Sequence, residues 1–222
     1  NQIEQEKIAD CMLSLDELIE AQTQKIEAIK QHKKGLMQQL FPQEGERVPK
    51  LRFPEFRDCG EWVEKQVKVI LDYERPDKYI VKNTNYINVG TSVLTANKSF
   101  ILGYTNEQEG IFDNLPVIIF DDFTIDNKYV DFPFKVKSSA IKILKTKEDN
   151  NLKFIYELIN QIKLETPEHK RYYISIFQEI FVKVPKPEEQ EKIADFLSSI
   201  DDLINAQTQK VEALKQHKKG LI

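Results

Sequence analysis

The sequence is poor in glycine, cysteine and long apolar runs, and each shortage excludes a class of protein. Seven glycines in 222 residues leave no glycine-rich loop of the kind that cradles phosphates or a dinucleotide. Two cysteines far apart in the chain form neither a disulfide framework nor a zinc-ligand set, which favours a reducing compartment. No apolar run approaches the ~20 residues of a membrane-spanning helix, and the amino-terminal residues lack the features of a signal peptide. We expect a cytoplasmic protein without membrane segment, metal or cofactor.

An excess of basic charge is also missing. The net charge is -4, whereas nucleic-acid-binding domains usually carry a basic footprint. Any DNA-binding surface must therefore be a local patch. With 41% hydrophobic and 31% charged residues, the chain is typical of a soluble, foldable protein, and its length suits one globular core together with extended helices.

An internal repeat dominates the sequence. Residues 4–36 recur as residues 189–221 without any insertion, and roughly three-quarters of the aligned positions are identical. Each copy carries apolar residues at alternating steps of four and three, which is the heptad spacing of a coiled coil. A helix with one apolar seam needs a partner helix. We therefore predict two paired helices whose seam contains Ile8, Met12, Leu15, Ile19, Gln22, Ile26 and Ile29, and in the second copy Ile193, Leu197, Ile200, Ile204, Gln207, Val211 and Leu214.

The charge pattern of the repeat predicts how the helices pair. Acidic residues fill the first half of each copy and lysines fill the second half. Antiparallel pairing sets acid against base, whereas parallel pairing would bring like charges together. Gln22 and Gln207 in mid-seam either specify the register or are tolerated, solvated gaps. The helices can pair within one chain or across two chains of a swapped dimer.

The segment between the repeats is predicted to be a mixed α/β domain. Gly35 and Pro42 are expected to end the first helix. We place the first repeat helix at 1–42, a linker at 43–60, the domain at 61–185 and the second repeat helix at 186–222. The residues predict a helix at 149–164 and strands at 67–71, 79–82, 115–122, 129–136, 139–145 and 172–185. The expected fold is thus α+β, with one mixed α/β domain and two long repeat-related helices in an antiparallel coiled coil.

This layout resembles the specificity subunits of type I restriction-modification systems. The resemblance is carried by EQEKIADFLSSIDDLI with QKVEALKQHKKGL, by LMQQLFP, and by VPKLRFPEFRDCGEW, which opens the domain at Trp62. In that family two target-recognition domains alternate with two similar helical regions. The resemblance implies a non-catalytic subunit that reads one half of a split site in double-stranded DNA. It also implies that the helix pair docks methyltransferase subunits and, through them, a restriction subunit.

Only one recognition domain is present, which departs from the family pattern. We expect either a fragment or a natural half-subunit, whose second domain is supplied by another copy in a homodimer. No Asn-Pro-Pro-Tyr-like base-flipping motif occurs in the chain, so methyl transfer is expected in a partner.

Candidate DNA contacts are basic residues for phosphates and polar loop residues for bases. Lysines predominate from Lys128 to Lys147, where Asp131 alone opposes them, although lysine also guards exposed strand edges. The loop GYTNEQEG and the segment TPEHKRYY offer polar side chains. The candidates are Lys98, Tyr104, Thr105, Asn106, Gln108, Lys128, Lys135, Lys137, Lys170, Arg171 and Tyr172.

The sequence leaves two alternative functions open, a metal-dependent nuclease and a coiled-coil scaffold. Asp121, Asp122, Asp126 and Lys128 contain the Asp-x-Lys half of a metal-dependent nuclease site, but so short a motif is frequent by chance. The three histidines, His32, His169 and His217, are interpreted as surface residues rather than metal ligands. A coiled-coil scaffold that never touches DNA is the remaining alternative.

Overall fold

The computed structural model describes residues 2–97, 99–164 and 171–221, and its contacts divide the chain into two units. We call Asn1–Cys59 with Asp195–Ile222 the helical unit, and Gly60–Ala194 the sheet unit. The helical unit contains α1 (Gln2–Leu40), a short 3-10 turn (Pro54–Phe56) and most of α4 (Pro187–Gly220). The first residues of α4, up to Ala194, belong to the sheet unit. In the helical unit the prediction that Gly35 begins the end of the first helix is wrong, because α1 continues to Leu40, next to Pro42.

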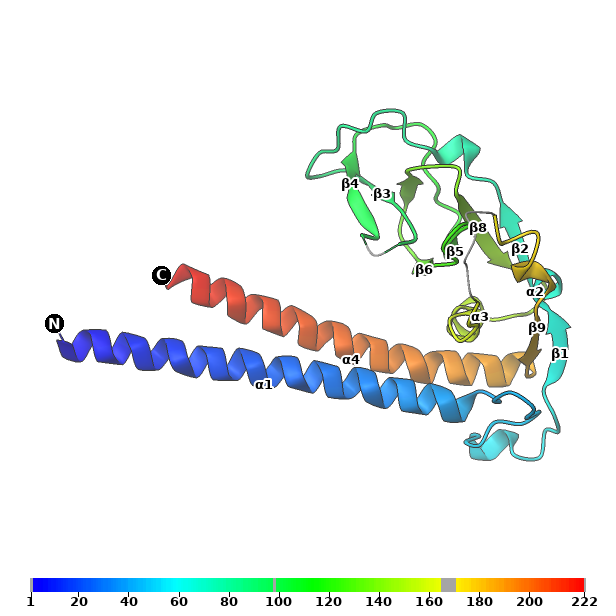
Figure 1. The fold of residues 1–222 in the computed structure, drawn as a ribbon, viewed down its shortest axis with the longest axis horizontal. Coiled ribbons are helices and arrows are strands. Elements are labelled where there is room, and N and C mark those ends of the chain that lie inside the picture. Colours follow the sequence, from blue (N-terminus) through cyan, green and yellow to red (C-terminus); the bar gives the residue numbers. More distant parts are fainter. Residues whose placement is uncertain (1, 98, 165–170, 222) are drawn as a thin grey trace. The chain divides into compact units, whose positions relative to one another are not determined.

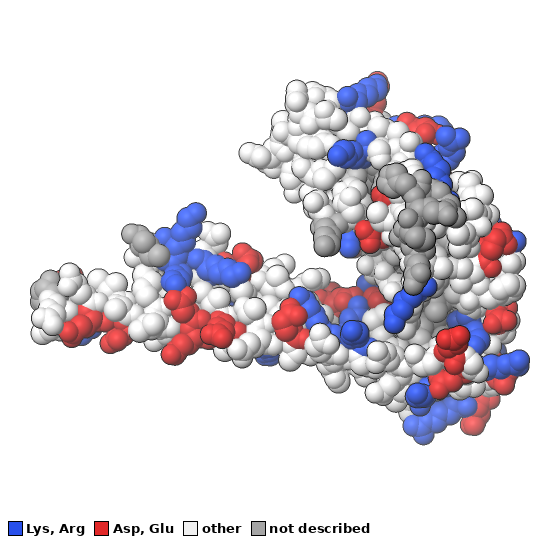
Figure 2. Space-filling view, in the orientation of Figure 1, with Lys and Arg blue, Asp and Glu red and all other residues white. Residues whose placement is uncertain are grey.

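In the helical unit, α1 and α4 of the same chain lie side by side and run in opposite directions (Figure 1). Lys33 Nζ lies 2.7 Å from Asp201 Oδ1, and Lys218 Nζ lies 2.6 Å from Asp16 Oδ2. The predicted antiparallel pairing is therefore confirmed. Acidic atoms along the first half of α1 lie next to basic atoms at the carboxyl end of α4 (Figure 2), which is the charge complementarity that the sequence indicated.

The two ion pairs are copies of each other. Lys33 and Lys218 occupy the same position of the repeat, as do Asp16 and Asp201. Two repeat-related helices in antiparallel contact therefore have a local two-fold axis, which relates these two ion pairs.

Burial along the two helices follows the heptad spacing. Ile26 and Val211, which are equivalent in the repeat, are 6% and 4% exposed. Most other predicted seam residues are buried or half-buried. Ile8 differs: it is 53% exposed. Gln22 and Gln207 each bury a side-chain oxygen that has no hydrogen-bond partner.

The sheet unit is built from three sheets. Strands β1 (Val63–Gln66) and β9 (Phe181–Val184) form an antiparallel pair. An antiparallel sheet has the order β2-β8-β5-β6, with β2 Leu71–Glu74, β8 Ile141–Thr146, β5 Val117–Asp121 and β6 Asn127–Val130. The third sheet has the order β4-β3-β7, with β4 Ile101–Thr105, β3 Thr91–Leu94 and β7 Phe134–Val136, and in it β3 and β7 are parallel.

The core lies between the two larger sheets and under α3 (Leu152–Ile159). One cluster joins Leu94 and Val136 to Ile119 and Ile143, so the third sheet packs on one face of the four-stranded sheet. On β5, Ile119 enters that cluster, whereas the ring of Phe120, the next residue, packs on Phe177 at 4.6 Å, as the side-chain alternation of a strand requires. Helix α3 contacts β5, β6 and β8. Its amino terminus is capped by Asn151, whose side chain accepts a hydrogen bond from the backbone N–H of Phe154.

Several predicted elements are wrong in type or extent. Residues 67–70 form the helical turn α2 (Val67–Ile70), because Val67 and Ile70, three positions apart, are the buried residues. Residues 77–79 form a 3-10 turn, and 79–82 contribute only a single bridge, from Ile80 to Val136. The strand predicted at 129–136 is two strands, interrupted before Phe134 at Pro133, which has no backbone N–H. The helix predicted at 149–164 is limited to α3, and 172–185 contains only a short turn (Phe177–Glu179) and β9.

Candidate nucleic-acid interface

Two loops meet at the outer edge of the third sheet, where β4 is the edge strand. The first follows β4 and contains Asn106 and Gln108, both exposed. The second, residues 83–90, pairs with β4 from outside, since the backbone groups of Ile87 and Tyr104 exchange hydrogen bonds of 2.9 and 3.1 Å. A recognition surface on loops held by a rigid sheet is the usual arrangement in binding proteins.

Glu107 holds the two loops together. The backbone N–H groups of Lys82 and Asn83 donate to Glu107 Oε1, each at 2.9 Å. Lys135 Nζ lies 3.0 Å from Glu107 Oε2 and donates to the carbonyl oxygen of Glu109 at 2.6 Å. The Asn83 N–H and the Lys135 ammonium favour the ionised carboxylate and hold the pKa of Glu107 below its ordinary value.

The structure buries two of the candidate DNA contacts near this edge. Lys135 is 1% exposed, and its ammonium group pairs with Glu107 inside the loop. Thr105 is 5% exposed, and its hydroxyl oxygen accepts a hydrogen bond from the Glu107 N–H. Of the other candidates in this sheet, Tyr104 is half-buried and Lys137, directly after β7, is exposed.

Loop 83–90 is not among the candidates predicted from the sequence, because its apolar residues follow no regular spacing. It carries three amides, Asn83, Asn85 and Asn88, all on exposed residues. Two of its apolar residues are also exposed, Val89 at 81% and Ile87 at 44%. The loop approaches β4 closely at Gly103, which has a φ of +156°, and a Cβ there would meet Tyr86 Cβ at 2.5 Å. Only glycine allows this contact.

A second cluster forms around Asp122, at the end of β5. Asp122 is 1% exposed and accepts a hydrogen bond from the backbone N–H of Tyr173 at 2.9 Å. Lys142 Nζ lies 3.1 Å and Arg171 NH1 3.4 Å from its other oxygen. Asp122 therefore fixes the segment 171–173 against β5 and β8.

Tyr172 is another candidate DNA contact that the structure buries. It is 1% exposed, and its backbone N–H donates to the carbonyl oxygen of Asp122. Tyr173, its neighbour, is also buried, and burial raises the pKa of its hydroxyl. Two adjacent buried side chains are incompatible with the half-buried strand that was predicted here.

Two other described basic candidates, Lys128 and Arg171, belong to segments other than these loops. Lys128 is half-buried on β6, in the four-stranded sheet. Arg171 keeps a side chain that is 52% exposed. Lys98 and Lys170 lie outside the described residues.

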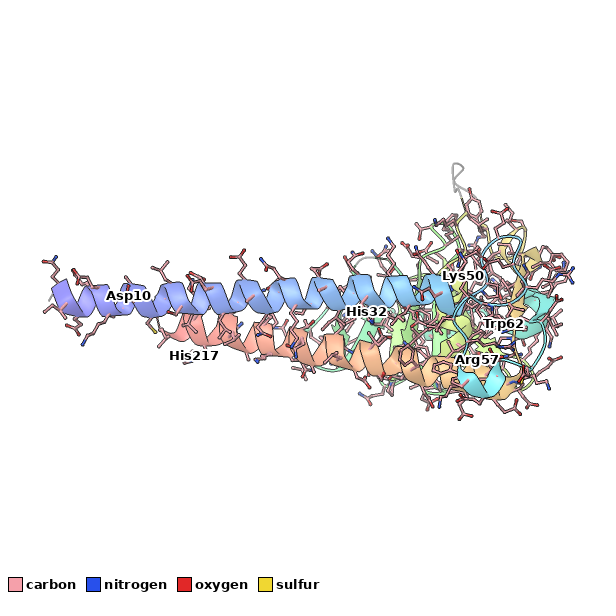
Figure 3. All side chains as sticks on the ribbon, turned by 90° about the horizontal axis from the view of Figure 1, so that it is seen from below. Asp10, His32, Lys50, Arg57, Trp62 and His217 are labelled. Atoms are coloured by element: carbon pink, nitrogen blue, oxygen red, sulfur yellow. The ribbon has the colours of Figure 1, made fainter. Side chains whose placement is uncertain are left out.

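Asp121 and Asp126, which were considered as part of a nuclease site, make the hydrogen bonds of a turn. Asp121 Oδ1 accepts hydrogen bonds from the backbone N–H groups of Phe123 and Thr124, and Asp126 pairs with the Thr124 hydroxyl. Within residues 2–97, 99–164 and 171–221, no group of three histidine, cysteine or acidic side chains is arranged to hold a metal ion. His32 and His217 lie far apart along the helix pair (Figure 3), and His169 is outside the described residues. None of the described helices has the length and apolar character needed to cross a membrane.

Comparison with known proteins gives the family. The family model described as "Type I restriction modification DNA specificity domain" matches residues 60–216. The EcoR124I/EcoR124II specificity subunit of Escherichia coli is 47% identical over 138 residues, which are 59% of this chain and 34% of that protein. A protein of Methanocaldococcus jannaschii named as the MjaX specificity subunit is 28% identical over 241 residues, covering 99% of this chain and 55% of that protein.

Solved structures of low identity share the fold. The type I restriction-modification S subunit from M. genitalium matches all of this chain and 60% of its own, with a TM-score of 0.71 at 14% identity. The HsdS subunit from Thermoanaerobacter tengcongensis matches 97% of this chain and 55% of its own, with a TM-score of 0.54 at 13% identity. The chain thus spans between about a third and three-fifths of these proteins. Because the family model covers most of the chain, from the start of the sheet unit into the second repeat helix, this chain belongs to the type I restriction modification DNA specificity domain family.

Proposed function

We propose that the sheet unit reads the sequence of double-stranded DNA, as one half of a bipartite recognition site, and that the chain itself is not an enzyme. The observation that carries the proposal is the pair of loops at the β4 edge, which present exposed amides beside Ile87 and Val89. Amide side chains can bond adenine through two hydrogen bonds, and apolar side chains contact the thymine methyl group. These are the groups that distinguish base pairs in the major groove.

The first prediction concerns base choice. Asn106→Ala and Gln108→Ala are expected to weaken the preference for the favoured base pair at one position by roughly 10-fold each, since one bidentate contact contributes about 1–3 kcal/mol of discrimination. The measurement is enrichment of duplexes from a randomised pool by each purified variant. Asn160→Ala, which removes an exposed amide after α3, is the matched control and should leave the enriched motif unchanged. An identical motif for all three variants would contradict the assignment of this loop.

We further propose that the helix pair docks methyltransferase subunits, which supply the chemistry, and that a restriction subunit joins through them. The local two-fold axis presents every surface of the pair twice. Leu18 and Leu203, which are equivalent in the repeat, are 41% and 46% exposed, so each offers the same apolar contact to one copy of the same partner.

Exchange of helices between two chains is the alternative assembly, and light scattering of the purified chain separates the two.

The second prediction concerns stoichiometry. We expect the full chain to bind two copies of a methyltransferase subunit from the same restriction-modification system, and Leu18→Lys or Leu203→Lys to lose one copy each. The double variant should lose both, measured as the mass of the purified complex. Leu13→Lys, at a residue that is 61% exposed and equivalent to Ser198, is the control. Two bound copies on the double variant would rule out this docking surface.

A further inference from the structure

A pocket in the sheet unit includes the Asp122 cluster and lies outside the loops at the β4 edge. It has a volume of about 230 Å³ and is lined by Tyr73, Arg75, Asp122, Lys142, Arg171 and Ile174. These residues come from β2, the ends of β5 and β8, and the segment after residue 170, so the fold alone brings them together. A volume of this size exceeds that of several water molecules and has room for a small anion.

The lining carries more positive than negative charge. Arg75, Lys142 and Arg171 are cationic, whereas Asp122 is the one carboxylate among the lining residues. Lys142 is buried, with 5% of its side chain exposed, and Asp122 is its ion-pair partner. Arg75 contacts Asp77 through Nε at 3.0 Å, but both side chains are more than half exposed, where solvent weakens the pair. Part of the positive charge in the pocket is therefore left without a carboxylate to balance it.

The two arginines retain donors for a further ligand. Arg171 NH1 lies 3.4 Å from Asp122 Oδ2 and 3.5 Å from the Ser139 carbonyl oxygen, longer than the roughly 2.7–2.9 Å of a strong charge-assisted bond. A guanidinium has five N–H donors in a planar fork that matches the oxygens of a phosphate. Tyr73 and Ile174 add apolar surface to the wall of the pocket.

We propose that this pocket binds a phosphate group, and that in the complex with DNA it holds one backbone phosphodiester. That the phosphate belongs to DNA depends on the proposed function. That the pocket binds a phosphate group depends on the positive charges of Arg75, Lys142 and Arg171. A backbone contact of this kind fixes the register of the protein on the duplex and carries no base information. It therefore complements the loops at the β4 edge, which carry the base contacts.

The test is the salt dependence of DNA binding by the full chain. Each phosphate neutralised contributes about -0.9 to the slope of log K against log salt concentration. Arg75→Gln and Arg171→Gln should each make the slope shallower by up to about 0.9, and should weaken binding to the enriched motif and to a scrambled duplex by the same factor. Lys68→Gln removes an exposed, ion-paired lysine that does not line the pocket and should leave the slope unchanged. Arg75 is 72% exposed, so its replacement leaves the fold intact.

A titration with inorganic phosphate separates this inference from the proposed function. We expect phosphate to shift the backbone amide resonances of Tyr73 and Ile174, and Arg171→Gln to abolish that shift. If the wild-type chain selects a DNA motif and both arginine variants keep its salt slope, the pocket proposal fails while the proposed function stands. If the chain binds no DNA but still binds phosphate through Arg171, the proposed function fails and the pocket is a site for a free phosphate. Absence of both the phosphate shift and the slope change overturns the inference.

Discussion

Asp122→Ala is expected to lower the stability of the sheet unit by about 3–5 kcal/mol, the usual effect of removing one partner of a buried ion pair. Lys142 would keep a buried charge without its carboxylate, and the backbone N–H of Tyr173 would lose its acceptor. For a unit of this size the unfolding temperature should fall by roughly 10 °C. Trp62, the one tryptophan of the chain, is buried in the sheet unit, so its fluorescence reports this transition.

Two control variants make the cause specific. Asp126→Ala removes an exposed carboxylate of the same turn, which bonds the Thr124 hydroxyl, and should change stability by no more than about 0.5 kcal/mol. Asp122→Ala combined with Lys142→Met removes both charges and should recover much of the loss, because no unpaired charge stays buried. An unfolding temperature for Asp122→Ala equal to that of Asp126→Ala would refute the role of this cluster.

The same substitution at two equivalent positions of the repeat is expected to change the stability of the chain by very different amounts. Ile193 is 1% exposed, whereas its repeat equivalent, Ile8, is 53% exposed. Ile193→Ala should cost about 2–5 kcal/mol through lost contacts and a cavity. Ile8→Ala should stay within about 0.5 kcal/mol. Urea unfolding followed by circular dichroism measures both variants.

This pair of variants is its own control. Both sites are isoleucines in the same EQEKIAD segment of the repeat, and they differ in burial. Similar losses at both positions would mean that the amino-terminal part of α1 is covered in solution, and would contradict the register set by the two ion pairs.

Long-range regularity made the helical unit predictable. The repeat and its heptad spacing gave two long helices, and the separation of acid from base gave their antiparallel pairing, because both signals accumulate over many residues. The exposure of Ile8 escaped prediction, since the heptad pattern places this residue in the seam.

The candidate site was less predictable, because its residues meet only in the fold. Lys135 looks like a surface lysine in the sequence, and its partner Glu107 lies in a different element. Tyr172 was predicted at the start of a half-buried strand, and its burial follows only from the fold, in which its backbone N–H donates to the Asp122 carbonyl oxygen. Arg75 was not singled out at all, because the pocket it lines draws on four separate segments. The buried strands β5 and β8 were predicted correctly, since β-branched residues recur in both.

Selection of duplexes from a fully randomised pool by the purified wild-type chain tests the central claim most directly. A sheet unit that reads base edges through the loops at the β4 edge should enrich one short motif, and scrambled duplexes should bind at least about a thousandfold more weakly at physiological salt. Binding of the pool without any enriched sequence, or no binding of duplexes at all, would contradict the account.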